Sequence, residues 1–222
     1  MRDFCVHLVC CCAMDGASTE PVHGSREFHI HWALFYCRSD CRLLYQESSI
    51  AEYLAPHELV AVLNDYLETV LAPIRAHGGV VNTFIGDGLF ASFNMPLACE
   101  DHAVAAVRAA IDIQRAVTSR TFGDQGVALD TRIGISTGNV IGGSVGAAQR
   151  LSYTLLGDTV NLAARLEELN KQYATRILVS ESTREACGER FVFAGLGSVT
   201  VRGRSDAVAI FSVDPNGQGT NS

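Results

Sequence analysis

Apolar residues recur at helical spacing in several stretches of the chain. The first such stretch predicts a helix that begins at Pro56, since proline suits the first turn of a helix. Pro73 should kink or interrupt this helix, and residues 77–79 should end it. An alanine-rich helix is predicted over residues 101–117, since its apolar side chains fall on one side. Two further helices, one long and one short, are predicted over residues 157–170 and 181–187.

Short apolar or alternating runs between these helices predict strands. The predicted strands lie at residues 31–37, 80–85, 89–93, 127–135 and 176–179. One more is predicted between residue 135 and the helix at 157, and two more inside 191–211. Residues 86–88 read Gly-Asp-Gly, a tight turn that joins the second and third strands into a β-hairpin. Strands and helices mixed in this order predict an α+β sandwich, with helices packed on a mostly antiparallel sheet.

Composition narrows the class of protein. The chain has 222 residues, of which 48% are hydrophobic, and its formal net charge is −7 at pH 7. This predicts one acidic, globular domain that does not bind nucleic acid, since such binders carry clustered basic surfaces. No apolar run approaches the ~18 residues that span a bilayer, so no membrane span is expected in this chain. We expect a poorly organised segment over residues 1–28, one folded domain over 29–213 and a disordered tail over 214–222.

The cysteines favour a reduced, cytoplasmic protein. Six of the eight lie within the first 41 residues, whereas a disulfide framework would spread pairs through a small secreted fold.

A Gly-x-Ser-x-Gly pattern occurs twice, around Ser136 and Ser144. In serine hydrolases this pattern marks a nucleophile on a strand-to-helix elbow, with a histidine later in the chain. Here no histidine follows His102, and no helix follows either serine directly. We therefore interpret the segment as a glycine-rich connection between strands.

Two features suit a phosphate-bearing ligand, although each has an ordinary structural reading. Asp87 at the hairpin tip is placed to hold Mg²⁺, or it belongs to a simple Gly-Asp-Gly turn. Asn161 and Arg165 are four residues apart near a helix N-terminus, an arrangement that suits an anion. The alternative is a capped surface helix in which Arg165 pairs with a nearby glutamate.

Taken together, the motifs resemble the catalytic domain of class III nucleotidyl (adenylate/guanylate) cyclases. The resemblance covers about residues 55–213 in the family's order and spacing. It is carried by Phe84-Ile-Gly-Asp-Gly88, Asp101-His-Ala103, Arg132-Ile-Gly-Ile-Ser-Thr-Gly138 and the long stretch from Tyr153 to Glu167. It implies a ferredoxin-like cyclase sandwich that acts as a homodimer. It also implies the conversion of ATP to 3′,5′-cyclic AMP and pyrophosphate, with two Mg²⁺ or Mn²⁺ ions per site.

The resemblance also implies residue roles. Asp87 matches a metal-binding aspartate, Asn161 the residue that orients the ribose, and Arg165 the residue that stabilises charge on the α-phosphate. Arg202 occupies the position of the family's triphosphate-binding lysine, and Thr83 and Thr154 occupy the purine-contacting positions. The site is expected at a head-to-tail dimer interface, with the metal residues on one chain and Asn161 and Arg165 on the other.

The chain departs from the family at two places. The Asp-x-x-Gly-Phe-Thr motif of the first metal aspartate is missing; Leu43 stands at the usual spacing, and Asp40 is the nearest carboxylate. We assign Asp40, in place of this first metal aspartate, as a metal ligand alongside Asp87. Our hypothesis for the lost motif is a local reading-frame disruption, testable by resequencing the DNA. Thr83 matches neither base-recognition pattern, which leaves GTP as a possible substrate. A catalytically degenerate cyclase-homology domain, serving in dimerisation or nucleotide sensing, remains the alternative function.

Overall fold

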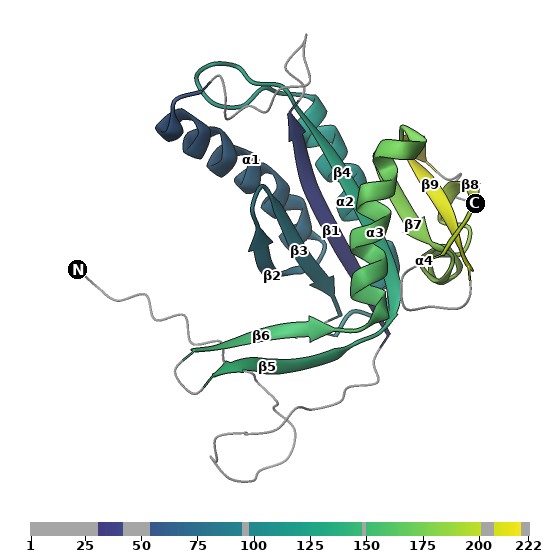
Figure 1. Cartoon of the computed structure of the whole chain (residues 1–222). Coiled ribbons are helices and arrows are strands. Elements are labelled where there is room, and N and C mark those ends of the chain that lie inside the picture. Colours follow the sequence, from purple (N-terminus) through teal and green to yellow (C-terminus); the bar gives the residue numbers. More distant parts are fainter. Residues whose placement is uncertain (1–30, 42–53, 95–97, 148–149, 201–206, 219–222) are drawn as a thin grey trace.

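The computed structural model describes residues 31–41, 54–94, 98–147, 150–200 and 207–218 (Figure 1). The strands are β1 (His31–Cys41), β2 (Val80–Ile85), β3 (Gly88–Phe93), β4 (Leu129–Asn139), β5 (Ile141–Ala147), β6 (Arg150–Leu156), β7 (Ile177–Ser180), β8 (Phe191–Thr200) and β9 (Ala207–Gln218). The helices are α1 (Pro56–Ala76), α2 (His102–Thr118), α3 (Asp158–Tyr173) and α4 (Glu181–Cys187).

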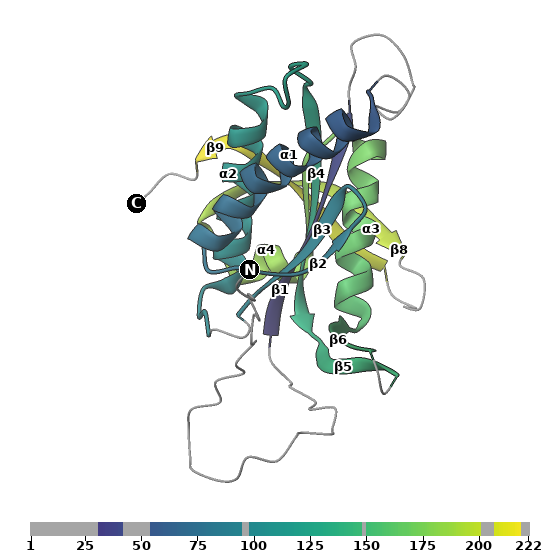
Figure 2. The same cartoon turned by 90° about the vertical axis from the view of Figure 1, so that its left-hand side faces the viewer.

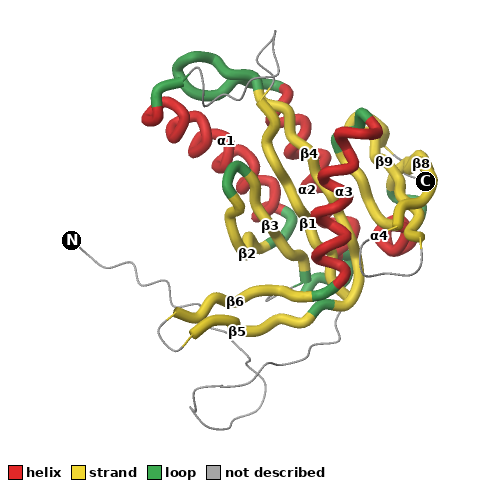
Figure 3. The backbone as a smooth tube through the Cα atoms, viewed as in Figure 1, coloured by secondary structure: helices red, strands yellow, loops and turns green. Residues whose placement is uncertain are grey.

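Seven of these strands form one mixed sheet. Their order across the sheet is β2-β3-β1-β4-β7-β9-β8, and only the β4–β7 pair is parallel. β5 and β6 pair with each other in a separate two-stranded ribbon that projects from the sheet (Figures 1 and 3). The predicted α+β class and mostly antiparallel sheet are confirmed.

Helices cover both faces of the sheet. In the rotated view, α1 and α2 lie on one side of the central strands and α3 on the other (Figure 2). Two apolar clusters account for this arrangement, because each helix buries one side against the sheet. The larger cluster joins α1 and α2 to the strands, and the second joins α3 to β7 and β9 through Leu162, Leu166, Leu169, Leu178 and Ile210.

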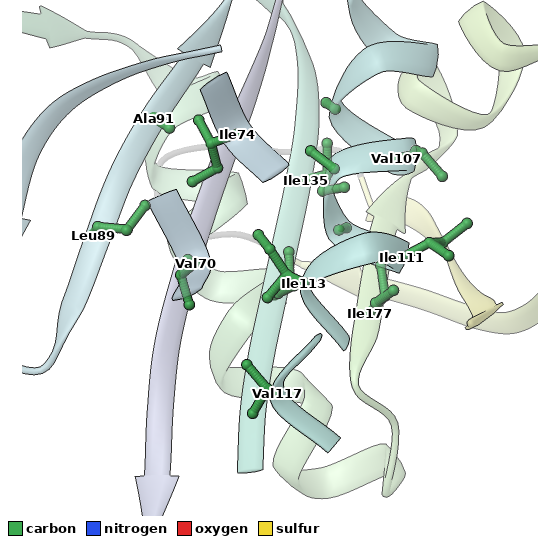
Figure 4. Close-up of a cluster of buried hydrophobic side chains, with 14 of the residues drawn as sticks. Val70, Ile74, Leu89, Ala91, Val107, Ile111, Ile113, Val117, Ile135 and Ile177 are labelled. Carbon is green, nitrogen blue, oxygen red and sulfur yellow. The ribbon is translucent and has the colours of Figure 1, made fainter. Parts of the chain in front are cut away.

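The larger cluster forms the main core. Val70 and Ile74 of α1, Ile113 of α2, and Leu89 and Ala91 of β3 are each 0% exposed (Figure 4). At roughly 1.5–3 kcal/mol per fully buried large aliphatic side chain, these contacts supply much of the driving force for folding.

α1 is one continuous helix, so of the two effects predicted for Pro73, a kink or an interruption, the interruption is wrong. Pro73 lies in the last turn of α1, between Val70 and Ile74, both of which are fully buried. A proline removes one backbone hydrogen bond from a helix. Burial of the side chains on either side of Pro73 outweighs that loss at this position.

The glycine-rich segment also differs from the prediction. It contains a strand, β5, rather than only a connection, and β5 pairs with β6 along its whole length, from Ile141–Leu156 to Ala147–Arg150. Ser136 lies within β4 rather than on a strand-to-helix elbow, and its hydroxyl is buried. Both observations agree with the rejection of a serine hydrolase.

Two further findings concern the cysteines and the membrane. Among the described residues, Cys99 and Cys187 carry free thiols, and burial raises the pKa of the Cys187 thiol to about 12. Cys187 is therefore a protonated packing residue at neutral pH. Within the same part of the chain, no helix is both long and apolar enough to cross a bilayer.

Candidate active site

The β2–β3 hairpin presents Asp87 at its tip. Gly86 precedes it with φ of +60°, a left-handed backbone conformation that glycine adopts without strain. The Asp87 side chain is half-buried, whereas the neighbouring Phe84 and Ile85 are 53% and 46% exposed. The hairpin therefore holds a carboxylate beside an exposed apolar surface.

The pairing of β1 with β3 ends close in sequence to both Asp40 and Asp87. β1 pairs with β3 so that Arg38 lies opposite Gly88. Asp40 follows Arg38 by two residues, and Asp87 directly precedes Gly88. The two candidate metal-binding aspartates, 47 positions apart in the sequence, therefore both lie close in the chain to one end of the β1–β3 pairing.

Two carboxylates, Asp40 and Asp87, could hold a divalent cation only together with other ligands. Mg²⁺ is usually bound by one or two carboxylates together with substrate phosphates, rather than by an all-protein cage. Within the described ranges, no three histidine, cysteine, aspartate or glutamate side chains converge on a common point. A metal held here by Asp87 and Asp40 would therefore need oxygens from the nucleotide as well.

α3 presents Asn161 and Arg165 to solvent. The helix starts after Gly157, and the Thr159 hydroxyl donates to the Asn139 carbonyl at 3.1 Å, which fixes its first turn to the end of β4. Asn161 and Arg165 are both exposed, on the side of α3 away from the buried Leu162 and other core residues. The sequence-predicted pair therefore shares one accessible face.

Arg165 is paired with a glutamate, as the ordinary structural reading predicted. Its Nη1 lies 2.8 Å from Oε2 of Glu168, and the two side chains are 45% and 62% exposed. Exposed pairs of this kind contribute only about 0–1 kcal/mol. A phosphate could displace Glu168 at little cost, so the pairing does not conflict with anion binding.

The residues predicted to contact the purine lie on two different hairpins. Thr83 is exposed on β2, and its hydroxyl donates to the Phe84 carbonyl at 3.3 Å. Thr154 is half-buried on β6, opposite Gly143. Arg202 lies outside the described residues.

A cavity of about 520 Å³ lies at the carboxyl end of β4. Its walls include three carboxylate residues, Asp158, Glu181 and Glu185, and none of the sequence-predicted site residues. Like charges repel, so this acidic cavity is unsuited to a triphosphate. Of the predicted nucleotide-binding residues that the structure describes, Thr83 is exposed on β2, Asn161 and Arg165 are exposed on α3, and Thr154 is half-buried on β6.

Sequence reasoning did not single out Arg132 and Glu167, although both lie inside the family motifs. Arg132 Nε donates to Glu167 Oε1 at 2.9 Å across the β4–α3 contact. Their 35-residue separation gives no periodic signal of pairing, so only the packing of α3 on the sheet brings them together.

The fold and motifs together define a nucleotidyl cyclase catalytic domain. Residues 42–214 match the sequence profile of the adenylate and guanylate cyclase catalytic domain. The chain belongs to this family.

Relatives from bacteria and a slime mould agree with this assignment. "Adenylate cyclase 1" of Rhizobium meliloti is 38% identical over 173 residues, which is 77% of this chain and 26% of that protein. "Adenylate cyclase, terminal-differentiation specific" of Dictyostelium discoideum is 39% identical over 171 residues, 75% of this chain and 8% of that protein. "Adenylate cyclase" of Anabaena cylindrica is 35% identical over 171 residues, which is 75% of this chain and 34% of that protein. The chain thus spans about a third or less of these relatives.

Solved structures show the same fold. The adenylyl cyclase CyaB from P. aeruginosa is 27% identical with a TM-score of 0.70, covering 83% of this chain and 93% of the solved chain. The guanylyl cyclase Cya2 is 32% identical with a TM-score of 0.70, and the match covers 84% of this chain and 93% of the solved chain. The neighbours therefore include cyclases named for either purine.

Proposed function

We propose that this chain is an adenylate cyclase that converts ATP to 3′,5′-cyclic AMP and pyrophosphate in a homodimer with two divalent metal ions per site. The observation that carries the proposal is the family match over residues 42–214, together with relatives named adenylate cyclase at 35–39% identity. The accessible Asn161–Arg165 face supports it, as do the positions of Asp40 and Asp87 close in the chain to one end of the β1–β3 pairing.

In this proposal the two halves of the site come from different chains. Asp87 and Asp40 of one chain hold the Mg²⁺ or Mn²⁺ ions, which when bound activate the ribose 3′-hydroxyl and neutralise phosphate charge. Arg165 of the other chain, released from Glu168, stabilises the charge that develops on the α-phosphate. Asn161 of that chain orients the ribose, so that the 3′-oxygen approaches the α-phosphorus.

The remaining assigned residues bind the rest of the nucleotide. Arg202 carries the positive charge for the triphosphate; arginine keeps the charge of the family's lysine but offers a planar, forked set of donors. Thr83 and Thr154 contact the purine through hydroxyl groups, which both donate and accept hydrogen bonds.

A second candidate function rests on the missing Asp-x-x-Gly-Phe-Thr motif. Without a carboxylate in the family's place, the domain would serve in dimerisation or nucleotide sensing. One assay separates the two functions: purified protein is incubated with ATP or GTP plus Mn²⁺, and the cyclic product is measured by chromatography. Cyclic AMP from ATP supports the enzyme, whereas nucleotide binding without any cyclic product supports the degenerate domain.

The variant Thr83→Lys is expected to raise the preference for ATP over GTP by about ten- to a hundredfold. A lysine would donate a charge-assisted hydrogen bond, worth roughly 1.5–3 kcal/mol, to the unprotonated N1 of adenine. Guanine N1 carries a hydrogen, so it would face a mismatched donor. The ratio of kcat/KM for the two nucleotides measures the change. Thr121→Lys, at an exposed loop position, is the matched control, and an unchanged ratio in folded Thr83→Lys would remove Thr83 from the purine site.

Mixing two inactive variants, Asp87→Ala and Arg165→Ala, is expected to restore about a quarter of wild-type activity. Random pairing makes half of the dimers mixed, and each mixed dimer has one intact site out of two. Wild-type activity should also rise faster than linearly with protein concentration at low concentration, because monomers lack a complete site. Failure to complement, with mixed dimers demonstrated by mass spectrometry, would mean that each site lies within one chain.

A further inference from the structure

α3 is joined to β4 by a buried ion pair. The donor, Nε of Arg132 on β4, belongs to a side chain that is only 13% exposed, and the Glu167 side chain that accepts the bond on α3 is 2% exposed. Buried ion pairs are weak contributors to stability, because desolvation offsets their attraction, and well-packed apolar residues often replace them without loss. Their best-attested use is to fix one arrangement among several.

Two further contacts fix α3 at neighbouring β4 positions. Asn170 Nδ2 donates to the Ile133 carbonyl at 2.9 Å. Gly134 faces the α3 backbone so closely that a Cβ there would overlap Ala163 and Glu167. The helix therefore contacts three consecutive β4 residues, and its rotation about its own axis is constrained.

This rotation sets where Asn161 and Arg165 point. Glu167 follows Arg165 by two residues, so at about 100° per residue the two side chains project to nearly opposite sides of the helix. Side-chain ends lie about 5–6 Å from a helix axis, so a rotation of about 20° moves them by about 2 Å. A misplacement of about 1 Å costs about a hundredfold in catalysis.

We propose that Arg132 and Glu167 are positioning residues that set the rotation of α3 and thereby direct Asn161 and Arg165 toward the nucleotide. This proposal rests on the proposed cyclase function, and it assigns the two residues no contact with substrate.

Two variants separate positioning from stability. Arg132→Met/Glu167→Met replaces the pair by flexible apolar side chains, so Tm is expected to stay near wild type while kcat falls at least about tenfold. KM for ATP should change less than about twofold, because the lost alignment matters in the transition state. Glu167→Gln keeps an oxygen that accepts from Arg132 Nε but removes the negative charge that faces the Arg132 guanidinium. Its Tm is therefore expected to fall while kcat, measured where the variant is folded, stays within about threefold of wild type.

The matched control is Arg176→Met. It removes the exposed Arg176–Asp130 pair, which also ends on β4, and both kcat and Tm should stay near wild type. A purely structural role for Arg132 and Glu167 predicts that kcat follows Tm in every variant, and that result would overturn the proposal. If the double methionine variant does not fold, Arg132→Lys keeps the charge without the fixed Nε–H direction; unchanged kcat there would also overturn it.

Hydrogen–deuterium exchange gives a readout that does not depend on catalysis. Peptides covering residues 158–167 are expected to exchange faster in the double methionine variant than in wild type or Glu167→Gln. Equal exchange in all three proteins would refute the positioning role. Absence of cyclic product from wild-type protein would instead refute the proposed function, and the exchange experiment would still decide the structural part.

Discussion

Asp87→Ala is expected to abolish cyclisation, with a loss of at least about a thousandfold in kcat/KM. In the proposed site Asp87 helps to hold the metal ions, whose stabilisation of developing charge is worth several kcal/mol, and each ~1.4 kcal/mol is a tenfold change in rate. Asp87 stands at the tip of a tight turn, with its side chain half-buried. Truncation to alanine should therefore remove the metal ligand without disturbing the core.

The measurement is cyclic product formed from ATP across a range of Mn²⁺ concentrations. Asp124→Ala is the matched control, because Asp124 is an exposed loop carboxylate on another part of the chain, and its activity should equal that of wild type. Thermal unfolding of both variants checks that each is folded. Substantial activity in Asp87→Ala, with its metal dependence intact, would remove Asp87 from the proposed metal site.

Gly134→Ala is expected to destabilise the protein by about 1–3 kcal/mol or more. The added methyl group would overlap the Ala163 carbonyl oxygen and the Glu167 backbone nitrogen, and backbone atoms of a packed helix cannot move aside as a flexible side chain can. Overpacking of this kind costs typically 1–3 kcal/mol, and more where the backbone must shift. Because α3 would be pushed from β4, cyclase activity should fall along with stability.

Urea unfolding followed by circular dichroism measures this effect. Gly195→Ala on β8 is the matched control, since its Cβ would meet the nearest atom, on Phe211, at an ordinary 3.6 Å. The free energy of unfolding of that variant should stay within about 0.5 kcal/mol of wild type, as is usual for exposed surface substitutions. Equal stability of the two alanine variants would mean that α3 packs against β4 less closely than described.

Local sequence patterns predicted most of the secondary structure. The helix over residues 101–117 and the hairpin around Asp87 follow from apolar periodicity and from the Gly-Asp-Gly turn, and both were confirmed. Patterns failed where packing outweighed propensity. Pro73 remains inside α1 because its neighbours are buried, and glycine-rich β5 is a strand because β6 pairs with it.

The residues of the candidate site can be chosen from the amino-acid sequence, most of them through the family motifs and Asp40 through its position in the chain. Their spatial placement cannot be read in the same way. The assignment of Asp40 rests on proximity in sequence alone, and only the β1–β3 pairing shows that its strand lies against the strand that follows Asp87. The Arg165–Glu168 pair was foreseen only as an alternative, because an arginine on a helix has several carboxylates within reach.

The sequence by itself determined the family, most of the order of helices and strands, and the residues available for chemistry, since turns and periodic apolar faces are encoded within a few neighbouring positions. Only the tertiary structure decided which strand pairs with the Asp87 hairpin and how α3 is placed on β4. Those features depend on strand register and on the Arg132–Glu167 contact, which join residues tens of positions apart. Such contacts form only when the whole sheet and its helices pack together, so no local pattern carries them.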